Sequence, residues 1–271
     1  MGLLVRTWNL FHGNAVPPER HAYLEVMVRV ITEDDPDLVC LQEVPLWALS
    51  RLAPWSGMSA FPATAAPARF GPFPSTPSLG RAVTALHHGL LRSAFTGQGN
   101  AILARGAFRP LEQRTLVLND RRFRRAQARW LSLDVGARLA WGKERRVCQA
   151  VRFRVENDST LLLANLHATA YPADRRLADA ELLRAAVFAD GLAAVDETLV
   201  LAGDFNVRAP SSRTLADLTG REWGFAAYSH GVDHVLVRGA PLERGYAWPP
   251  ERRRRAGRLL SDHAPIEARL G

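Results

Sequence analysis

Six short polar clusters, spread along the chain, contain the residue types that hydrolytic chemistry needs. They are Trp8-Asn9, Leu41-Gln42-Glu43-Val44, Asn165-Leu166-His167, Gly203-Asp204-Phe205-Asn206, Asp233-His234 and Ser261-Asp262-His263. Five of the six lie at the end of, or inside, an apolar run that predicts a buried strand. A buried charge without a partner is costly, so it usually persists only when it is paired or bound to a metal. We therefore predict that several strands deliver carboxylates and imidazoles to one point.

The carboxylates in these clusters predict a site for a hard divalent cation. Glu43 and Asp204 each end an apolar run, Asn206 follows two residues after Asp204, and Asp262 belongs to a later cluster. Oxygen ligands suit Mg²⁺ or Mn²⁺, and no Cys/His cluster has the spacing of a zinc site. Mg²⁺ commonly takes one or two carboxylates and leaves its other positions to water and substrate phosphate. We expect Mg²⁺ as the cofactor, with Mn²⁺ as an alternative.

Two histidines are the candidates for proton transfer, because imidazole titrates near neutral pH. His263 follows Asp262, and a carboxylate such as Asp233 could hold one ring nitrogen and make the other a better base. His167 is the second candidate. His234 should point to the opposite side of its strand from Asp233, and we interpret it as structural. Surface or packing roles are the default for His12, His21, His87, His88 and His230.

The charge of the chain is strongly basic. The net charge is +8, and Lys143 is the only lysine, so nearly all of the basic residues are arginines. The arginines cluster at residues 121–129, 145–154 and 252–255, and no Asp or Glu occurs from Val44 to Leu111. A positive surface attracts phosphate polymers and raises encounter rates, which predicts a nucleic-acid partner. A solvated surface in an arginine-biased protein explains the same pattern.

The composition predicts one soluble catalytic domain over residues 1–271. The chain is 47% hydrophobic, enough for a sizeable core, and it has neither a run long enough to cross a bilayer nor a secretory signal pattern. We expect a cytoplasmic monomer with no membrane association and no obligate protein partner. Cys40 and Cys148 lie in apolar runs and are interpreted as small buried hydrophobes, although a disulfide between them stays open.

The order of the predicted elements is that of an α/β protein. Helices are expected over residues 18–33 and 172–194, the latter with Pro172 near its first turn and Gly191 near its end. Residues 53–77, rich in Pro, Gly and Ser, are expected to form a loop. Strands are expected over 3–10, 37–42, 82–87, 100–104, 115–118, 128–135, 150–155, 161–165, 198–202, 232–237 and 264–270. Stacked sheets covered by helices accommodate this pattern.

The six clusters, together with Gly99-Asn100-Ala101-Ile102-Leu103, resemble the motifs of the endonuclease/exonuclease/phosphatase superfamily, the group related to pancreatic-type deoxyribonuclease. They occur in the order of that family and span Asn9 to His263. The resemblance implies a four-layer α/β sandwich of two packed, mostly antiparallel β-sheets flanked by helices. It also implies a divalent-metal phosphoesterase.

The resemblance carries roles over to individual residues. Glu43 looks like the principal metal ligand, with Asn9 and Asp262 as further contributors. Asp204 looks like the group that orients or deprotonates the attacking water, and Asn206 contacts the phosphate. His263 looks like the imidazole at the scissile phosphate, with Asp233 as its orienting partner, and His167 stabilises the transition state or protonates the leaving oxygen. Apart from these carried-over roles, we expect Asn100 and the clustered Arg122, Arg124 and Arg125 to bind the substrate.

Two departures from the family pattern narrow the function. Abasic-site endonucleases of this superfamily carry an Asp shortly after the first-strand Asn and a Tyr at the position of His167. Here Phe11 and His167 stand instead, which argues against dedicated abasic-site repair. The deoxyribonuclease branch pairs its His with a Glu that follows the metal Glu. No acid occurs from Val44 to Leu111, so His167 has another partner or none.

Three functions stay open at this stage. The first is a Mg²⁺-dependent nuclease acting on DNA, or less readily on RNA, in which loop arginines grip backbone phosphates without reading bases. The second is a phosphoesterase acting on an inositol phosphate or a phospholipid head group, because the motifs act on the phosphoryl group that all these substrates share. The third is a non-catalytic nucleic-acid-binding scaffold, which the completeness of the motif set disfavours.

Overall fold

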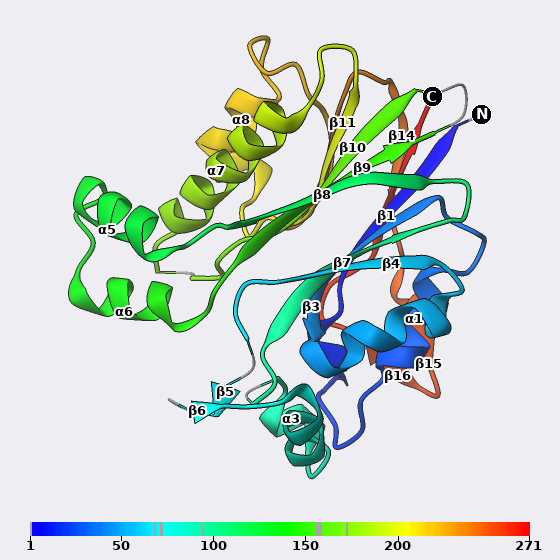
Figure 1. Ribbon diagram of the computed structural model, residues 1–271, viewed down its shortest axis with the longest axis vertical. Helices are drawn as coiled ribbons and strands as arrows, with labels where there is room; N and C mark the ends of the chain where they lie inside the picture. The colour runs from blue at the N-terminus through cyan, green and yellow to red at the C-terminus, as the bar shows by residue number, and fades with distance from the viewer. Residues whose placement is uncertain (1, 68, 71–72, 94, 156–158, 172) are drawn as a thin grey trace.

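Two six-stranded β-sheets pack face to face in the computed structural model, which describes residues 2–67, 69–70, 73–93, 95–155, 159–171 and 173–271 (Figure 1). The first sheet has the strand order β14 (Leu242–Ala247), β17 (Ile266–Leu270), β1 (Leu3–Asn9), β3 (Leu38–Pro45), β7 (Gln98–Ala104) and β4 (Ser59–Thr64). The second has the order β12 (Ala226–His230), β13 (Asp233–Arg238), β11 (Thr198–Asp204), β10 (Thr160–His167), β9 (Val147–Arg154) and β8 (Arg109–Val117). The pairs β1–β3 and β10–β11 are parallel and the others are antiparallel.

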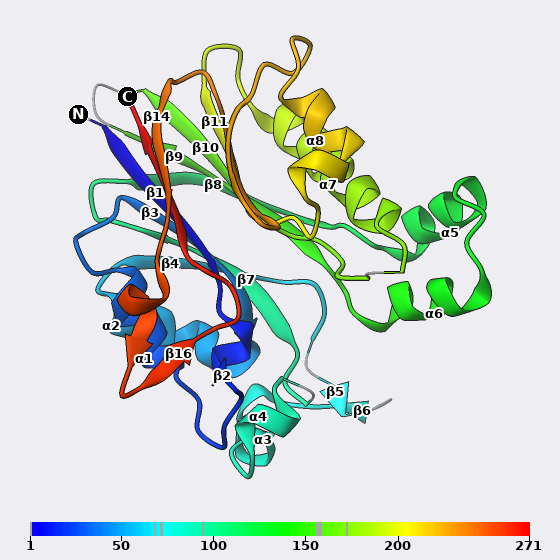
Figure 2. The same ribbon diagram turned by 180° about the vertical axis from the view of Figure 1, so that it is seen from behind.

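Helices cover the outer face of each sheet and complete four layers. On the first sheet lie α1 (Leu24–Ile31) and α2 (Leu52–Ser56), and on the second lie α7 (Arg176–Leu192) and α8 (Arg213–Leu218) (Figure 2). The inner layer is fully buried and includes Val5, Val151 and Val200. Alternation along β1 sends Val5 to this inner layer and Trp8 to the outer layer beneath α1. The four-layer α/β sandwich predicted from the sequence is confirmed.

Three further groups of elements surround this sandwich. The helices α5 (Arg121–Trp130) and α6 (Val135–Lys143) project from the second sheet, where Trp141 and Leu177 share a small core of their own. On the side of the first sheet are α3 (Pro77–Thr84), α4 (His88–Leu91), β5 (Arg69–Phe70) and β6 (Phe73–Pro74). Three short strands, β2 (Ala15–Val16), β15 (Arg254–Arg255) and β16 (Arg258–Leu260), form a separate sheet.

Two of the predicted strands are not strands but helix ends and turns. Residues 82–84 belong to α3. This helix begins at the Thr76-Pro77 pair, where the Thr76 hydroxyl accepts a hydrogen bond from the Leu79 N–H at 3.2 Å. Residues 128–135 include the end of α5, whose N-cap Asp120 accepts hydrogen bonds from the first-turn N–H groups. Both predictions gave weight to short apolar runs and missed the capping residues upstream.

Other element boundaries also differ from the prediction. The first helix begins at Leu24 and not at residue 18, because the carbonyls of Glu19 and Arg20 accept hydrogen bonds from residues at the start of α4. The expected loop over residues 53–77 contains β4, whose Pro62 is tolerated at the edge of the first sheet. The second predicted helix is observed as α7, and Pro172 lies outside the described residues.

Buried amides join the two sheets near one end. Gln42 on β3 donates a hydrogen bond to the Asn165 side-chain oxygen on β10 at 2.8 Å. Asn165 in turn donates to the backbone carbonyls of Leu41 and Ala101 at 3.0 and 2.9 Å. Both amides belong to the motif clusters, and their role here is to fix how the sheets face each other. Cys40 and Cys148 are buried free thiols. None of the described helices is long and apolar enough to cross a membrane.

Candidate active site

Strand register brings the motif residues to one edge of the sandwich. In the first sheet, Asn9 on β1 lies beside Gln42 on the parallel strand β3. In the second sheet, His167 on β10 lies beside Asp204 on the parallel strand β11, and Asp204 faces Asp233 at the start of the antiparallel strand β13. The carboxyl ends of parallel strands meet at the same edge of a sheet, so these side chains converge, as the sequence predicted.

Gly203 permits the close approach of β10 and β11 at this edge. Its φ is +141°, and a Cβ placed there would lie 2.0 Å from the carbonyl oxygen of Leu166. No side chain fits in that space, so a glycine is required immediately before Asp204. The backbone of the motif therefore sets the spacing between β10 and β11.

His263 and two aspartates form the tightest acid–imidazole group at the site. Among the residues with described positions, the ligand atoms of Asp204, Asp233 and His263 lie within 4.8 Å of one another. His263 Nδ1 is 2.9 Å from Asp233 Oδ2, and His263 Nε2 is 3.8 Å from Asp204 Oδ2. Because a carboxylate only accepts, Nδ1 carries a proton and Nε2 is directed toward Asp204. This is the arrangement predicted for a carboxylate-oriented imidazole.

The surroundings shift the pKa of both His263 and Asp204. Burial alone would lower the pKa of His263, but the hydrogen bond and charge of Asp233, together with the nearby aspartates, raise it to about 10. Burial raises the pKa of Asp204 to about 7, helped by the charge of Asp233 and opposed by His263 and by a hydrogen bond from Asn9. That hydrogen bond joins Asn9 Nδ2 to Asp204 Oδ2 at 2.9 Å. The site therefore holds a charged imidazole beside a carboxyl group that titrates near neutrality.

Glu43 is aimed into the site by an irregularity in β3. The pairing of β3 with β7 shifts between Leu41 and Val44, and Glu43 has a φ of +53°. Such bulges re-aim side chains next to active sites, and left-handed non-glycine residues cluster where function maintains them. Four further left-handed residues occur at this edge: Phe11, His12, Asn206 and Ser261. The backbone here is specialised for placing side chains.

His12 is a site residue that the sequence analysis assigned to surface or packing. Its Nε2 lies 3.0 Å from Glu43 Oε2, and its Nδ1 lies 2.8 Å from the hydroxyl of Ser93. Burial lowers the pKa of His12, so the neutral ring donates from Nε2 to Glu43 and accepts from Ser93 at Nδ1. The signal for it was the turn-forming Gly13-Asn14 pair directly after the first motif strand, which returns the chain to the site.

The partner of His167 is Arg146, which the sequence analysis also missed. Arg146 Nη1 lies 2.7 Å from His167 Nε2 and 2.9 Å from Nδ1, and Arg146 Nη2 pairs with Glu144 at 2.7 Å. Arginine only donates, so the contacted ring nitrogen must accept and the ring is neutral. Burial, and then the charge of Arg146, lower the pKa of His167 well below its usual value. His167 Nε2 also lies 3.6 Å from Glu43 and 3.7 Å from Asp204.

Glu43 and Asp262 fit a divalent cation. Within the described part of the chain, neither carboxylate pairs with an Arg or Lys, and the partners of Glu43 are two imidazoles. Burial raises the pKa of Asp262, His263 opposes this, and the charge of Glu43 raises it further, so the two carboxylates repel each other. A cation would offset that repulsion. Asn9 is close by, but its side-chain oxygen accepts from Phe11 N at 2.9 Å and its amide nitrogen contacts Asp204.

The remaining predicted residues lie in different settings. Asn206 follows the Asp204 strand end, and its amide donates to the Ala168 carbonyl at 2.9 Å. Asn100 is buried and donates to the carbonyls of Val147 and Asn165 at 3.1 and 3.4 Å, so its amide supports the strands. The α5 arginines, Arg122, Arg124 and Arg125, lie on the projecting helix and not in the acid–imidazole cluster. His234 is buried and bonded to Ser229 and Val207, as expected of a structural histidine.

Glu181 on α7 supports the segment that follows His167. It is fully buried and accepts hydrogen bonds from the N–H and hydroxyl of Thr169 at 2.7 and 2.8 Å, and another from Trp141 Nε1. Burial raises the pKa of Glu181, and these hydrogen bonds partly oppose the shift. Glu181 thus fixes the chain two residues after His167 against α6 and α7.

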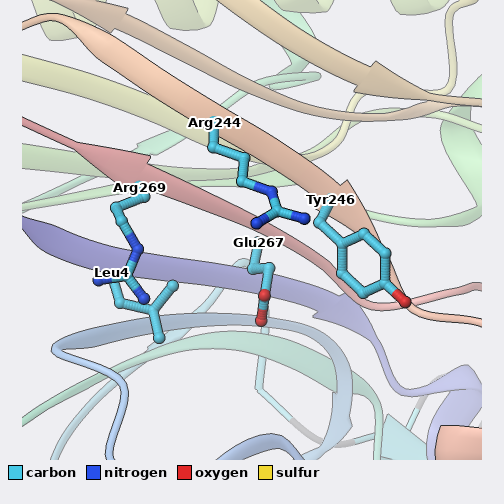
Figure 3. A pocket seen from close by; sticks show the side chains of 5 residues that line it. All are labelled: Leu4, Arg244, Tyr246, Glu267 and Arg269. Carbon is cyan, nitrogen blue, oxygen red and sulfur yellow. The ribbon is translucent and has the colours of Figure 1, made fainter.

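A hollow elsewhere on the molecule lacks such chemistry. Figure 3 shows it on the outer face of the first sheet, lined by Arg244, Tyr246, Glu267, Arg269 and Leu4. Its only acid, Glu267, already accepts hydrogen bonds from Arg6 and Trp248. The catalytic residue types therefore gather at the sheet edge and not in this hollow.

The fold and the cluster define a phosphoesterase of the deoxyribonuclease-like type. The chain belongs to the Endonuclease/Exonuclease/phosphatase family, whose model matches residues 7–263. Members of this superfamily are phosphoesterase hydrolases and generally use a divalent metal. No curated protein sequence matches the chain.

Solved structures share the whole architecture. An endonuclease/exonuclease/phosphatase from Bacteroides vulgatus is 14% identical with a TM-score of 0.69, covering 100% of this chain and 99% of that one. A humanized D. rerio TDP2 carrying 14 mutations is 14% identical with a TM-score of 0.66, over 100% and 99%. A functionally unknown conserved protein from Enterococcus faecalis V583 is 15% identical with a TM-score of 0.68, over 99% of both chains. At these identities the likeness establishes the fold alone.

Proposed function

We propose that this chain is a nuclease that hydrolyses phosphodiester bonds in DNA, using Mg²⁺ or Mn²⁺. The observation that carries the proposal is the His263–Asp233 pair. Asp233 holds Nδ1 of His263, and the other ring nitrogen, Nε2, faces Asp204 at 3.8 Å. A charged donor beside a carboxyl group that titrates near 7 is the pair needed to move a proton from an attacking water at neutral pH. We also propose that residues 1–271 form one catalytic domain.

Each residue then has a defined task. Asp204 accepts the proton of the attacking water, Asn206 holds the phosphate, and His263 Nε2 donates to a phosphoryl oxygen. His167, neutral beside Arg146, stabilises the transition state in preference to delivering a proton. Glu43, with Asp262 and the nearby Asn9, would hold the cation, which supplies positive charge to the phosphoryl oxygens when bound.

The charge of the chain supports DNA as the substrate. The net charge is +8. Arg124 and Arg125 line a groove of about 360 Å³, together with Arg121, Arg129 and Arg138. Such a surface attracts phosphate backbones without reading their sequence. A phosphoesterase acting on a small or lipid phosphate does not require it.

Plasmid nicking tests the proposal directly. Supercoiled plasmid is incubated with the protein and Mg²⁺, Mn²⁺ or EDTA, in parallel with the chromogenic diester bis(4-nitrophenyl) phosphate. His263→Ala should lower turnover by ~10²–10⁴-fold while the melting temperature stays near the wild-type value, and the exposed His230→Ala serves as the control. Intact plasmid under both metals, with the diester still cleaved, would reject the DNA assignment. Hydrolysis of neither substrate would reject an enzymatic function.

A further inference from the structure

A small basic pocket adjoins the catalytic cluster on the side of the second sheet. It has a volume of about 210 Å³, and its lining includes Tyr171, Arg175, Asn206, Arg208 and Val232. None of the motif assignments gives Tyr171, Arg175 or Arg208 a role. The pocket is smaller than the roughly 300–1,000 Å³ typical of drug-sized ligands, which suits a single charged group.

Two residues of the pocket wall are directly connected to the catalytic residues. The Asn206 N–H donates to Asp204 Oδ1 at 3.0 Å, and Val232 directly precedes Asp233. The Phe205 N–H donates to the Val232 carbonyl at 3.0 Å, which holds the two walls together. A group bound here would therefore lie next to the phosphate that Asp204 and His263 act upon.

The two arginines of the pocket have no acidic partner in the part of the chain that the structure describes. Asp174, which precedes Arg175 in the sequence, pairs with Arg176 at 2.7 Å, and Asp179 accepts a hydrogen bond from the Ser212 hydroxyl. Arg175 and Arg208 are both exposed, so their guanidinium groups remain open to a ligand. A planar guanidinium matches phosphate geometry, and two of them in one small pocket specify an anion.

We propose that this pocket binds the phosphate that neighbours the scissile one in a nucleic-acid strand. The inference rests on the proposed function and narrows it to substrates that carry two consecutive phosphates. Arg175 and Arg208 hold the second phosphate, and the half-buried Tyr171 ring lines the wall beside it. A phosphodiester with no neighbouring phosphate reaches the catalytic cluster without using the pocket.

The test compares substrates that differ only in a neighbouring phosphate. The thymidine dinucleotide dTpdT and its 5′- and 3′-phosphorylated forms are assayed together with bis(4-nitrophenyl) phosphate. The variants are Arg175→Met, Arg208→Met and the double variant, because Met keeps an apolar stem and removes the charge. Arg208→Lys keeps a charge without the planar fork, and Arg221→Met, an exposed arginine elsewhere, is the matched control.

The wild type should cleave one phosphorylated dinucleotide more efficiently than dTpdT. Each Met variant should lower kcat/KM for that substrate on the order of tenfold and leave the chromogenic diester unchanged. In EDTA, anisotropy of a labelled short oligonucleotide should show the same preference for a terminal phosphate, lost in the double variant. Equal kcat/KM and equal binding with and without the extra phosphate would overturn the pocket assignment, even with normal hydrolysis. Absence of hydrolysis would instead count against the proposed function, and the binding measurement would still decide the pocket.

Discussion

Replacing His12 should weaken metal binding without unfolding the protein. His12 donates to the Glu43 carboxylate at 3.0 Å and is itself held by Ser93 at 2.8 Å. A hydrogen bond to a charged group contributes about 1.5–3 kcal/mol, and about 1.4 kcal/mol corresponds to tenfold in affinity. The Glu43 side chain is 17% exposed, so water can replace part of the hydrogen bond from His12. We therefore expect His12→Leu to weaken Mn²⁺ binding about tenfold to 100-fold, the range known for residues that orient metal ligands.

Isothermal titration with Mn²⁺ measures this effect without relying on turnover. His12→Gln should restore most of the affinity, because its terminal amide can donate where the Nε2 of His12 does. The exposed His230→Leu should bind Mn²⁺ like the wild type. Wild-type or tighter affinity in His12→Leu would refute the reasoning, since it would mean that the ring competes for Glu43 and does not orient it. Similar losses in the Gln and Leu variants would indicate a purely structural role.

Four other perturbations follow from the site. Asp233→Asn should lower turnover by about 10²–10⁴-fold, because His263 loses the carboxylate that orients its ring. Gly203→Ala should destabilise the fold by about 1–3 kcal/mol or more in urea, whereas Gly224→Ala, at a left-handed position with open space, should cost less. Neutralising the α5 arginines should flatten the log–log salt dependence of duplex binding by about 0.9 per lost phosphate contact, and an unchanged slope would exclude them from binding. Because burial raises the pKa of Glu181, the protonated carboxyl stabilises the fold at low pH, and this contribution is lost as the pH rises through the pKa of the folded state. The melting temperature of Glu181→Gln, measured relative to that of the wild type, should therefore increase from acidic to neutral pH.

The sandwich was predictable because its central strands are continuous apolar runs. The strand segments 161–164 and 199–202 are buried on both faces, and such continuous apolar runs predict central strands. The peripheral helices were less predictable. α5 is dominated by arginines, and its start depends on the cap at Asp120, a signal that a search for apolar periodicity passes over.

Site residues that lie at strand ends could be predicted from the sequence. The residues that contact them from a turn or from a neighbouring strand could not. Asp204, Asp233 and His263 converge because register fixes strand ends relative to one another. His12 reaches Glu43 through a left-handed turn, a conformation that its neighbours do not specify on their own. Arg146 lies before β9 and meets His167 through the lateral pairing of strands, which the sequence order does not reveal.

The neighbours of the two imidazoles keep one ring neutral and the other positively charged. His167 faces a guanidinium within hydrogen-bond distance and is neutral, whereas His263 faces Asp233 and Asp204 and is charged. When the environment pushes two titratable groups apart in pKa, it separates the donor from the acceptor. The proton therefore resides on His263, beside Asp204, whose pKa is raised to about 7. His167, kept neutral by Arg146, does not compete for that proton, which is why one site can use two histidines for different tasks.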